Sequence, residues 1–198
     1  MSSYSQNEEQ LFILDYFQDK PIGNFIDIGA YDVFRFSNVR ALYEKGWSGK
    51  LIEPAPQNYK AIADHYKDDP RIEVLNFAVG DPAGEIDFYE SDGDAVGTTD
   101  EAHMKKWKDA GVNYTKIVVP QMGVVDFFNK YGKGVDFLSI DTEATNIAVF
   151  RNIPEFVFEQ IQLICIEHDN NINEIEEMCA KYGLTTIYTN AENILLAK

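Results

Sequence analysis

The chain has 198 residues, 45% of them hydrophobic, and a formal net charge of −16 at pH 7. This length predicts a single domain over residues 1–198, and the negative charge argues against a nucleic-acid partner because such a field repels phosphate. No apolar run approaches the ~18 residues of a membrane span, and no signal peptide opens the chain, so we expect a cytoplasmic protein without a membrane partner. Nothing in the sequence indicates the oligomeric state.

The first predicted elements are a helix and a buried strand that ends in a glycine turn. Apolar residues at helical spacing predict a helix over 7–18, within an N-terminal segment 1–23 that precedes the core, 24–198. The run FIDIGAYD, 25–32, predicts a parallel strand covered on both faces. Asp27 stands near its carboxyl end, where open α/β sheets bind ligands, and Gly29 would let the backbone approach a ligand. A plain strand-to-loop turn explains these residues equally well.

A second helix and strand follow. Ser37 is a candidate N-cap for a helix that ends at Gly46, and the start of that helix could bind a carboxylate. The short strand 50–53 ends in Glu53, next to Pro54. A carboxylate at this position can accept hydrogen bonds from two ribose hydroxyls, so Glu53 is a candidate nucleoside ligand.

The middle of the chain predicts a third strand and then an insertion. A helix that begins at Pro56 leads to the strand 72–77. Residues 85–90 and 116–119 read as edge strands that flank a polar loop, 91–100, and a short helix, 100–110. We expect this insertion to encode the choice of substrate. Two histidines, His65 and His103, lie in predicted helices and are expected at the surface.

Two further core strands end in acidic residues. The strands 135–140 and 161–166 are expected to lie side by side, and they run into Asp141-Thr142-Glu143 and Glu167-His168-Asp169. The last two predicted strands, 184–188 and 194–197, are separated by the polar segment 189–193. We expect Cys165 and Cys179 to be buried free thiols.

Four runs of this sequence resemble the FkbM-type family of S-adenosylmethionine-dependent methyltransferases. They are FIDIGAYD (25–32), RFSNVRALYEKGWSG (35–49), LIEPAPQNY (51–59) and VDFLSIDTEATNIAVF (135–150), the last similar to a family motif that runs into Ile-Asp-x-Glu-Gly. The resemblance implies a Rossmann-like class I α/β fold, a mostly parallel seven-stranded sheet with a C-terminal antiparallel hairpin, here with an added edge-strand insertion. It also implies S-adenosylmethionine as cofactor, and contacts to adenine in the segment 76–81.

Residues and resemblance together yield a candidate site. The candidate cofactor-binding residues are Asp27, Gly29, Ala30, Tyr31, Ser37, Glu53, Pro54, Asn76, Ala78 and Val79. Methyl transfer needs alignment and removal of a proton, and His168 is the first candidate base, Asp141 the second and Glu143 a weaker member. A divalent metal between these three is possible but not expected, since an Asp-x-Glu pair on a strand points its side chains to opposite faces.

Two positions depart from the family pattern. Val33 and Ala144 stand where the family usually has glycine, and a β-branched valine adopts a positive φ only at a cost. We therefore keep two functions open: an O-methyltransferase that acts on a sugar or other hydroxylated small molecule, and a non-catalytic binding domain with an altered cofactor loop. A nicotinamide-dependent oxidoreductase is disfavoured by the missing G-x-G-x-x-G motif and by the terminal hairpin.

Overall fold

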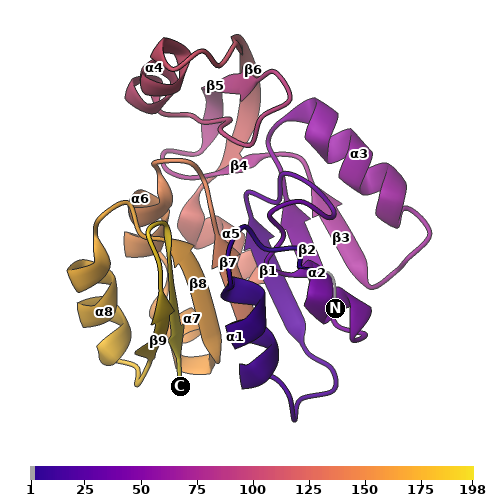
Figure 1. The fold of residues 1–198 in the computed structure, drawn as a ribbon, viewed down its shortest axis with the longest axis vertical. Helices are drawn as coiled ribbons and strands as arrows, with labels where there is room; N and C mark the ends of the chain where they lie inside the picture. Colours follow the sequence, from indigo (N-terminus) through magenta and orange to yellow (C-terminus); the bar gives the residue numbers. More distant parts are fainter. Residues whose placement is uncertain (1–2) are drawn as a thin grey trace.

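The computed structural model describes residues 3–198 and is organised around a seven-stranded sheet (Figure 1). In spatial order the strands are β3 (Ile72–Leu75), β2 (Ser48–Ile52), β1 (Asn24–Ile28), β7 (Phe137–Ile140), β8 (Leu163–Glu167), β10 (Asn193–Ala197) and β9 (Thr185–Thr189). The first five are parallel, and β10 is antiparallel to both β8 and β9. The predicted sheet, its hairpin and the pairing of the two acid-tipped strands are thereby confirmed.

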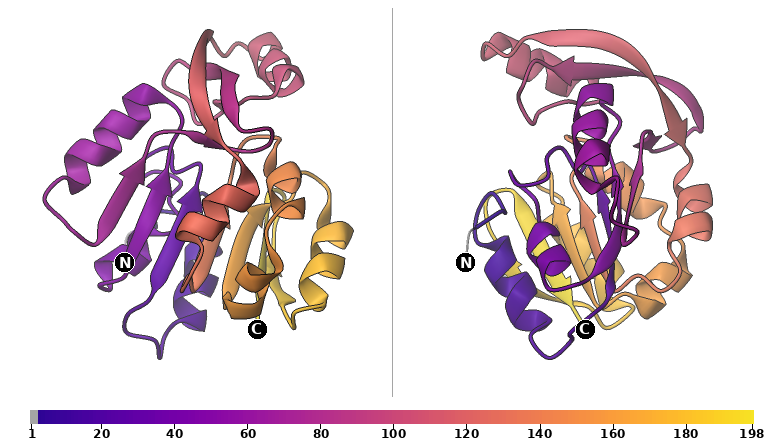
Figure 2. Two further views of the ribbon diagram at one scale, coloured as in Figure 1. Left: turned by 180° about the vertical axis from the view of Figure 1, so that it is seen from behind. Right: turned by 90° about the vertical axis from the view of Figure 1, so that its right-hand side faces the viewer.

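Helices cover both faces of this sheet (Figure 2). One face packs against α1 (Glu9–Tyr16), α2 (Arg40–Glu44) and α3 (Pro56–Tyr66). The other packs against α5 (Val124–Tyr131), α6 (Asn146–Arg151), α7 (Glu155–Gln160) and α8 (Ile172–Ala180). Two apolar cores result, one on each face. The helix α7 was not anticipated from the sequence.

The central strand β1 contributes to both cores in alternation. Phe25 packs with the α1–α3 core, whereas Ile26 and Ile28 pack with the α5–α8 core. Because successive side chains on a strand point to opposite faces, Asp27 lies on the same face as Phe25. This alternation directs the Asp27 carboxylate into the protein below the end of the strand.

The insertion forms a second sheet above the carboxyl ends of the main strands (Figure 1). It consists of β4 (Ala78–Val79), β5 (Gly84–Ser91) and β6 (Tyr114–Met122), with α4 (Glu101–Asp109) between β5 and β6. The two predicted strands of the insertion are present, but β5 pairs with β6 and β6 pairs with β4, and neither joins an edge of the main sheet. A small apolar core of its own, which includes Phe88 and Val119, supports this sheet.

Both cysteines, Cys165 and Cys179, are buried free thiols, as predicted. Among residues 3–198, no helix has the length and apolar character needed to cross a lipid bilayer.

Candidate functional site

A cavity of about 550 Å³ lies where the carboxyl ends of the parallel strands meet the insertion. Strand ends and turns supply its floor, and the segment 94–100 together with β5 supplies its roof. This volume falls within the ~300–1,000 Å³ typical of small-molecule sites. The position agrees with the rule that open α/β sheets bind ligands outside the carboxyl ends of their strands.

The structure brings eight of the thirteen candidate residues to this cavity. These are Gly29, Tyr31, Glu53, Pro54, Ala78, Val79, Asp141 and Glu143. The other five, which do not line it, are Asp27, Ala30, Ser37, Asn76 and His168.

Three of these five have structural roles next to the cavity. Asp27 is buried and hydrogen-bonds to Ser139 of the neighbouring strand. Ser37 accepts a hydrogen bond from the Arg40 backbone N–H, but the N-cap of α2 is Val39 rather than Ser37, and the start of that helix lies away from the cavity. Asn76 donates to the backbone oxygens of Glu53 and Pro54 and so braces the turn that presents them.

His168 occupies a position that does not suit a general base for this cavity. The side chain is buried, its Nδ1 accepts a hydrogen bond from the Asn170 N–H, and its Nε2 lies 3.3 Å from the Asn190 carbonyl oxygen. A neutral imidazole that accepts at Nδ1 must donate at Nε2. Both ring nitrogens are therefore engaged with backbone groups, and His168 does not line the cavity.

Glu53 is presented to the cavity by two backbone hydrogen bonds. Its Oε2 accepts from the Tyr31 N–H at 2.9 Å, and its Oε1 accepts from the Ala55 N–H at 2.8 Å. Burial raises the pKa of Glu53 to about 7, although the two N–H donors oppose the shift. Each carboxylate oxygen retains a further lone pair, so the group can still accept hydrogen bonds from a ligand.

Glycine is required at position 29 because the backbone that follows β7 passes close to it. Its φ is +90°, and a Cβ atom there would lie 1.6 Å from the carbonyl oxygen of Asp141. The sequence suggested that this glycine permits close approach to a ligand. The structure shows that it permits close approach of the β1 turn to the β7 turn, which sets the spacing of the cavity floor.

The acids that follow β7 and β8 form a connected group. The carboxyl groups of Asp141 and Glu167 hydrogen-bond to each other, and burial together with the Glu167 charge raises the pKa of Asp141 well above its usual value. The amide of Asn146 orders this region by donating to Glu167 at 2.6 Å and to Asp169 at 3.0 Å, while its oxygen accepts from the Thr142 N–H. Sequence reasoning missed Asn146, because only the tertiary fold brings α6 against both strand ends.

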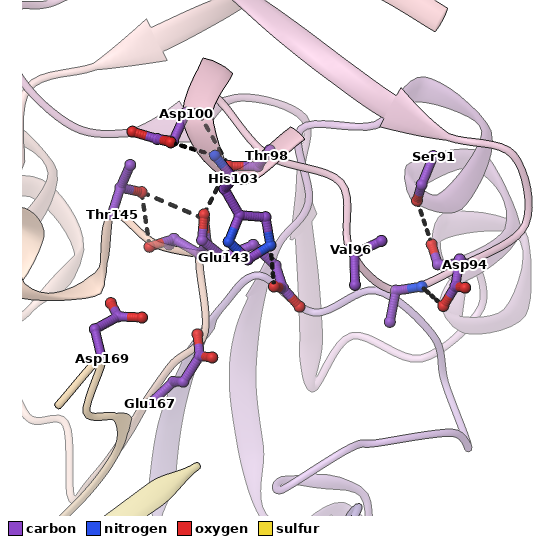
Figure 3. Close-up of polar contacts among 12 residues, drawn as sticks. Ser91, Asp94, Val96, Thr98, Asp100, His103, Glu143, Thr145, Glu167 and Asp169 are labelled. Carbon is purple, nitrogen blue, oxygen red and sulfur yellow. Dashed lines mark hydrogen bonds and ion pairs between the residues drawn. The ribbon is translucent and has the colours of Figure 1, made fainter. Parts of the chain in front are cut away.

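The insertion is tied to the turn that follows Asp141 (Figure 3). The Nε2 atom of His103, on α4, lies 3.0 Å from Oε2 of Glu143, although the contact is not aligned as a hydrogen bond. The Thr98 hydroxyl donates to the Glu143 carbonyl oxygen at 2.6 Å, and Asp100 caps α4 by accepting from the His103 N–H. The prediction that His103 lies at the surface is wrong; His65 is exposed, as predicted.

The two departures from the family pattern behave differently. Val33 is buried in the α1–α3 core, does not line the cavity and has no positive φ, so it avoids the backbone strain that glycine would relieve. Ala144 does adopt the left-handed conformation, with φ +76°, directly after Glu143 with φ +54°. Backbone strain of this kind costs roughly 1–3 kcal/mol per residue and is concentrated at functional sites.

Replacement of Ala144 by glycine should stabilise the protein. We expect a gain of about 0.5–1 kcal/mol in the free energy of unfolding, because relief of the left-handed strain exceeds the added entropy of the unfolded chain. Urea denaturation is the measurement. Ala148→Gly, in the interior of α6, is the matched control and should lose about 1 kcal/mol. Equal losses for both variants would show that the 143–144 turn carries no strain.

The buried carboxyl groups predict an unusual dependence of stability on pH. Burial raises the pKa of Asp27 to about 6 and those of Glu53 and Glu167 to about 7. Between their unfolded and folded pKa values the folded state binds more protons, so the free energy of unfolding should fall as pH rises from about 5.5 to about 8. Urea unfolding of the ligand-free protein at these two values tests this. Glu53→Gln should show a smaller decrease, and a stability that rises with pH would contradict the prediction.

Among residues 3–198, no group of three His, Cys, Asp or Glu side chains is arranged to hold a metal ion. His168 in particular does not join Asp141 and Glu143 at the cavity.

Residues 27–184 match the family model described as the Methyltransferase FkbM domain. The chain is a member of the FkbM methyltransferase family. The fold of the FkbM chain is that of class I Rossmann-like methyltransferases, a group whose cofactor is S-adenosylmethionine. A search of curated protein sequences finds no match.

Solved structures support the same fold. The present chain is similar to methyltransferase FkbM from Methylobacillus flagellatus KT, with 13% sequence identity and a TM-score of 0.56. The match covers 90% of the present chain but only 44% of the Methylobacillus protein. The present chain is also similar to precorrin-6y C5,15-methyltransferase from Geobacter metallireducens GS-15, with 12% identity, a TM-score of 0.51, and coverage of 100% and 92%. At these identities the likeness establishes the fold.

Proposed function

We propose that this FkbM chain transfers a methyl group from S-adenosylmethionine to a hydroxyl group of a small molecule, such as a sugar. One observation carries the proposal: the cavity brings together a nucleoside-type acid, Glu53, and a buried carboxyl group, Asp141, at the ends of β2 and β7, the two strands that flank β1. An acceptor of this size is also consistent with the cavity volume of about 550 Å³.

The residues around the cavity fit the cofactor. Glu53 would accept hydrogen bonds from the ribose hydroxyls, since its backbone donors leave lone pairs free. Pro54, Ala78 and Val79 offer apolar surface for the adenine. The buried Oδ1 atom of Asp141 has no hydrogen-bond partner, which indicates that a ligand completes this part of the site. When bound, S-adenosylmethionine supplies a methyl group activated by its sulfonium.

Asp141 would hold the acceptor hydroxyl and take its proton. The transfer forms one carbon–oxygen bond and breaks one carbon–sulfur bond, and the hydroxyl proton passes to the carboxylate. Glu167, hydrogen-bonded to Asp141, shares this proton within the pair. The roof formed by the segment 94–100 would keep water from the reacting atoms.

A small-molecule acceptor is preferred over nucleic acid on electrostatic grounds. Among the described residues that line the cavity there is no Lys, Arg or His side chain, and the chain carries a net charge of −16. A phosphate backbone would meet no counter-charge at this opening. The cytoplasmic location remains a prediction from the sequence.

Ligand binding tests the proposal and separates it from its rivals. Thermal-shift measurements with S-adenosylmethionine, S-adenosylhomocysteine and NAD should show stabilisation by the first two ligands. Stabilisation by NAD alone would favour an oxidoreductase. Binding without turnover on any hydroxylated acceptor would favour the non-catalytic binding domain, and no binding of any ligand would overturn the assignment of the cavity.

Glu53 supplies a sharper prediction. Glu53→Ala should weaken S-adenosylhomocysteine binding by about 1–3 kcal/mol, because charge-assisted hydrogen bonds to the ribose are lost. Isothermal titration calorimetry measures this. Glu73→Ala removes an exposed acid from the neighbouring strand and should leave the affinity unchanged. Equal affinities for wild type and Glu53→Ala would remove Glu53 from the cofactor site.

A further inference from the structure

Acidic side chains predominate among the titratable groups on the wall of the cavity. Nine of its lining side chains are Asp or Glu, and none of the described lining residues is Lys, Arg or His. S-adenosylmethionine, with a sulfonium, an ammonium and a carboxylate, brings a net charge of only +1. Buried carboxylates without counter-charges raise one another's pKa values and destabilise the folded state, so an additional cation would be favoured here.

Some of these acids have local structural roles. Asp100 caps α4, Asp81 accepts a hydrogen bond from the Val124 N–H, and Asp94 accepts one from the Ala95 N–H. These contacts satisfy hydrogen-bonding capacity but add no positive charge. Glu143 faces an imidazole, that of His103.

Three buried polar atoms on the lining residues have no partner at all. They are the acceptors Oδ1 of Asp141 and Oε1 of Glu90 and the donor Nε1 of Trp107. Buried groups of this kind are rare in folded proteins and cost roughly 1–3 kcal/mol each, so a ligand that pairs with them is favoured. A ligand could pair with the two carboxylate oxygens through a hydrogen-bond donor, and with the indole N–H of Trp107 through an acceptor such as a hydroxyl oxygen.

We infer that the acceptor is a hydroxylated small molecule that also carries a protonated amine, as an amino sugar does. The amine binds the carboxyl group formed by Asp141, Glu143 and Glu167 at the ends of β7 and β8, and a hydroxyl oxygen accepts from Trp107. This inference rests on the proposed function. The ammonium is a recognition group that keeps its charge, and a neighbouring hydroxyl remains the site of methylation.

The bound ammonium would also prepare the site for proton transfer. A cation near Asp141 and Glu167 lowers the pKa values that burial and mutual repulsion raise. The pair then holds its carboxylate form near neutral pH, which a proton acceptor requires. A neutral analogue would lack this effect.

A series of sugars that differ only at carbon 6 tests the inference. The probes are 6-amino-6-deoxyglucose, glucose and glucuronate, which carry a cation, a neutral hydroxyl and an anion on the same ring. Dissociation constants are measured by ligand-observed NMR with the wild-type FkbM chain saturated with S-adenosylhomocysteine. Saturation is first confirmed by calorimetry. If S-adenosylhomocysteine does not bind, the proposed function fails before the charge series is reached.

We expect the amino sugar to bind at least about tenfold more tightly than glucose, a difference of about 1.4 kcal/mol, and glucuronate not to bind. Glu167→Gln keeps the shape of the side chain and its contact with Asn146 but should abolish the preference for the amine. Glu101→Gln, which removes an exposed acid of α4 outside the cavity, should retain it.

Several outcomes would overturn the inference. They are equal binding of the amino sugar and glucose, tighter binding of glucuronate, or no binding of any of the three while S-adenosylhomocysteine is bound. The comparison of the three sugars on the wild-type protein needs no variant, so it decides the matter even if Glu167→Gln does not fold.

Discussion

Asp141→Asn should lower turnover by about 10²–10⁴-fold, the range typical of a lost general base. Asparagine keeps the size of the side chain and can still orient an acceptor hydroxyl, but it cannot take the proton. Because the proposed function assigns cofactor binding to Glu53 and the apolar turn residues, affinity for S-adenosylhomocysteine should remain nearly unchanged. The measurement is a comparison of turnover with an accepted substrate, together with a calorimetric titration of S-adenosylhomocysteine.

His168→Gln is the informative comparison for this variant. The sequence favoured His168 as the base, whereas the structure engages both of its ring nitrogens with Asn170 and Asn190. We expect His168→Gln to retain most of its turnover and to lose some stability. A large loss of turnover in His168→Gln with little loss in Asp141→Asn would reverse the two assignments.

Gly29→Ala should destabilise the protein by more than about 4 kcal/mol, a size of effect that few single substitutions reach. The added Cβ atom would lie 1.6 Å from the Asp141 carbonyl oxygen, which belongs to backbone and cannot rotate away. The turns that end β1 and β7 would have to separate, and the floor of the cavity would open with them. Urea denaturation measures the loss, and affinity for S-adenosylhomocysteine should fall in parallel.

Gly46→Ala separates this steric effect from backbone strain. Gly46 has φ +101°, similar to the +90° of Gly29, but no atom lies within 4 Å of the Cβ position. Alanine at Gly46 should therefore cost only the roughly 1–2 kcal/mol of a left-handed residue. Similar losses at the two glycines would show that the β1 and β7 turns are not in essential contact.

Periodicity and strand ends in the sequence were sufficient to predict the architecture. Buried parallel strands appear as continuous apolar runs, and such runs located β1, β7 and β8 to within a few residues. The antiparallel hairpin of β9 and β10 was predicted from the resemblance to the FkbM family. In contrast, the strands of the insertion showed an alternating pattern, which specifies one buried face but not the partner strand.

The candidate site shows where prediction from sequence stops. The position of an acid directly after a strand was enough to predict that Glu53 and Asp141 line the cavity, because the carboxyl ends of parallel strands converge on one crevice. The same rule failed for Asp27, which lies within β1 and does not line the cavity. Successive side chains on a strand point to opposite faces, so a position near the strand end does not by itself tell which way the side chain points. The sequence was also not enough to place His103, because a helix in an insertion has no fixed position until the two sheets meet.

The sequence by itself therefore determined the family, the sheet and the edge of the sheet at which the cavity lies, since these depend on local periodicity and on motifs along the chain. Only the tertiary structure decided which acids face the cavity, that Gly29 serves the contact between two turns, and that Val33 belongs to the core. It also brought Asn146, Trp107 and His103 to or beside the site. The physical reason is that these roles depend on contacts between segments distant in sequence, and no local pattern specifies such contacts.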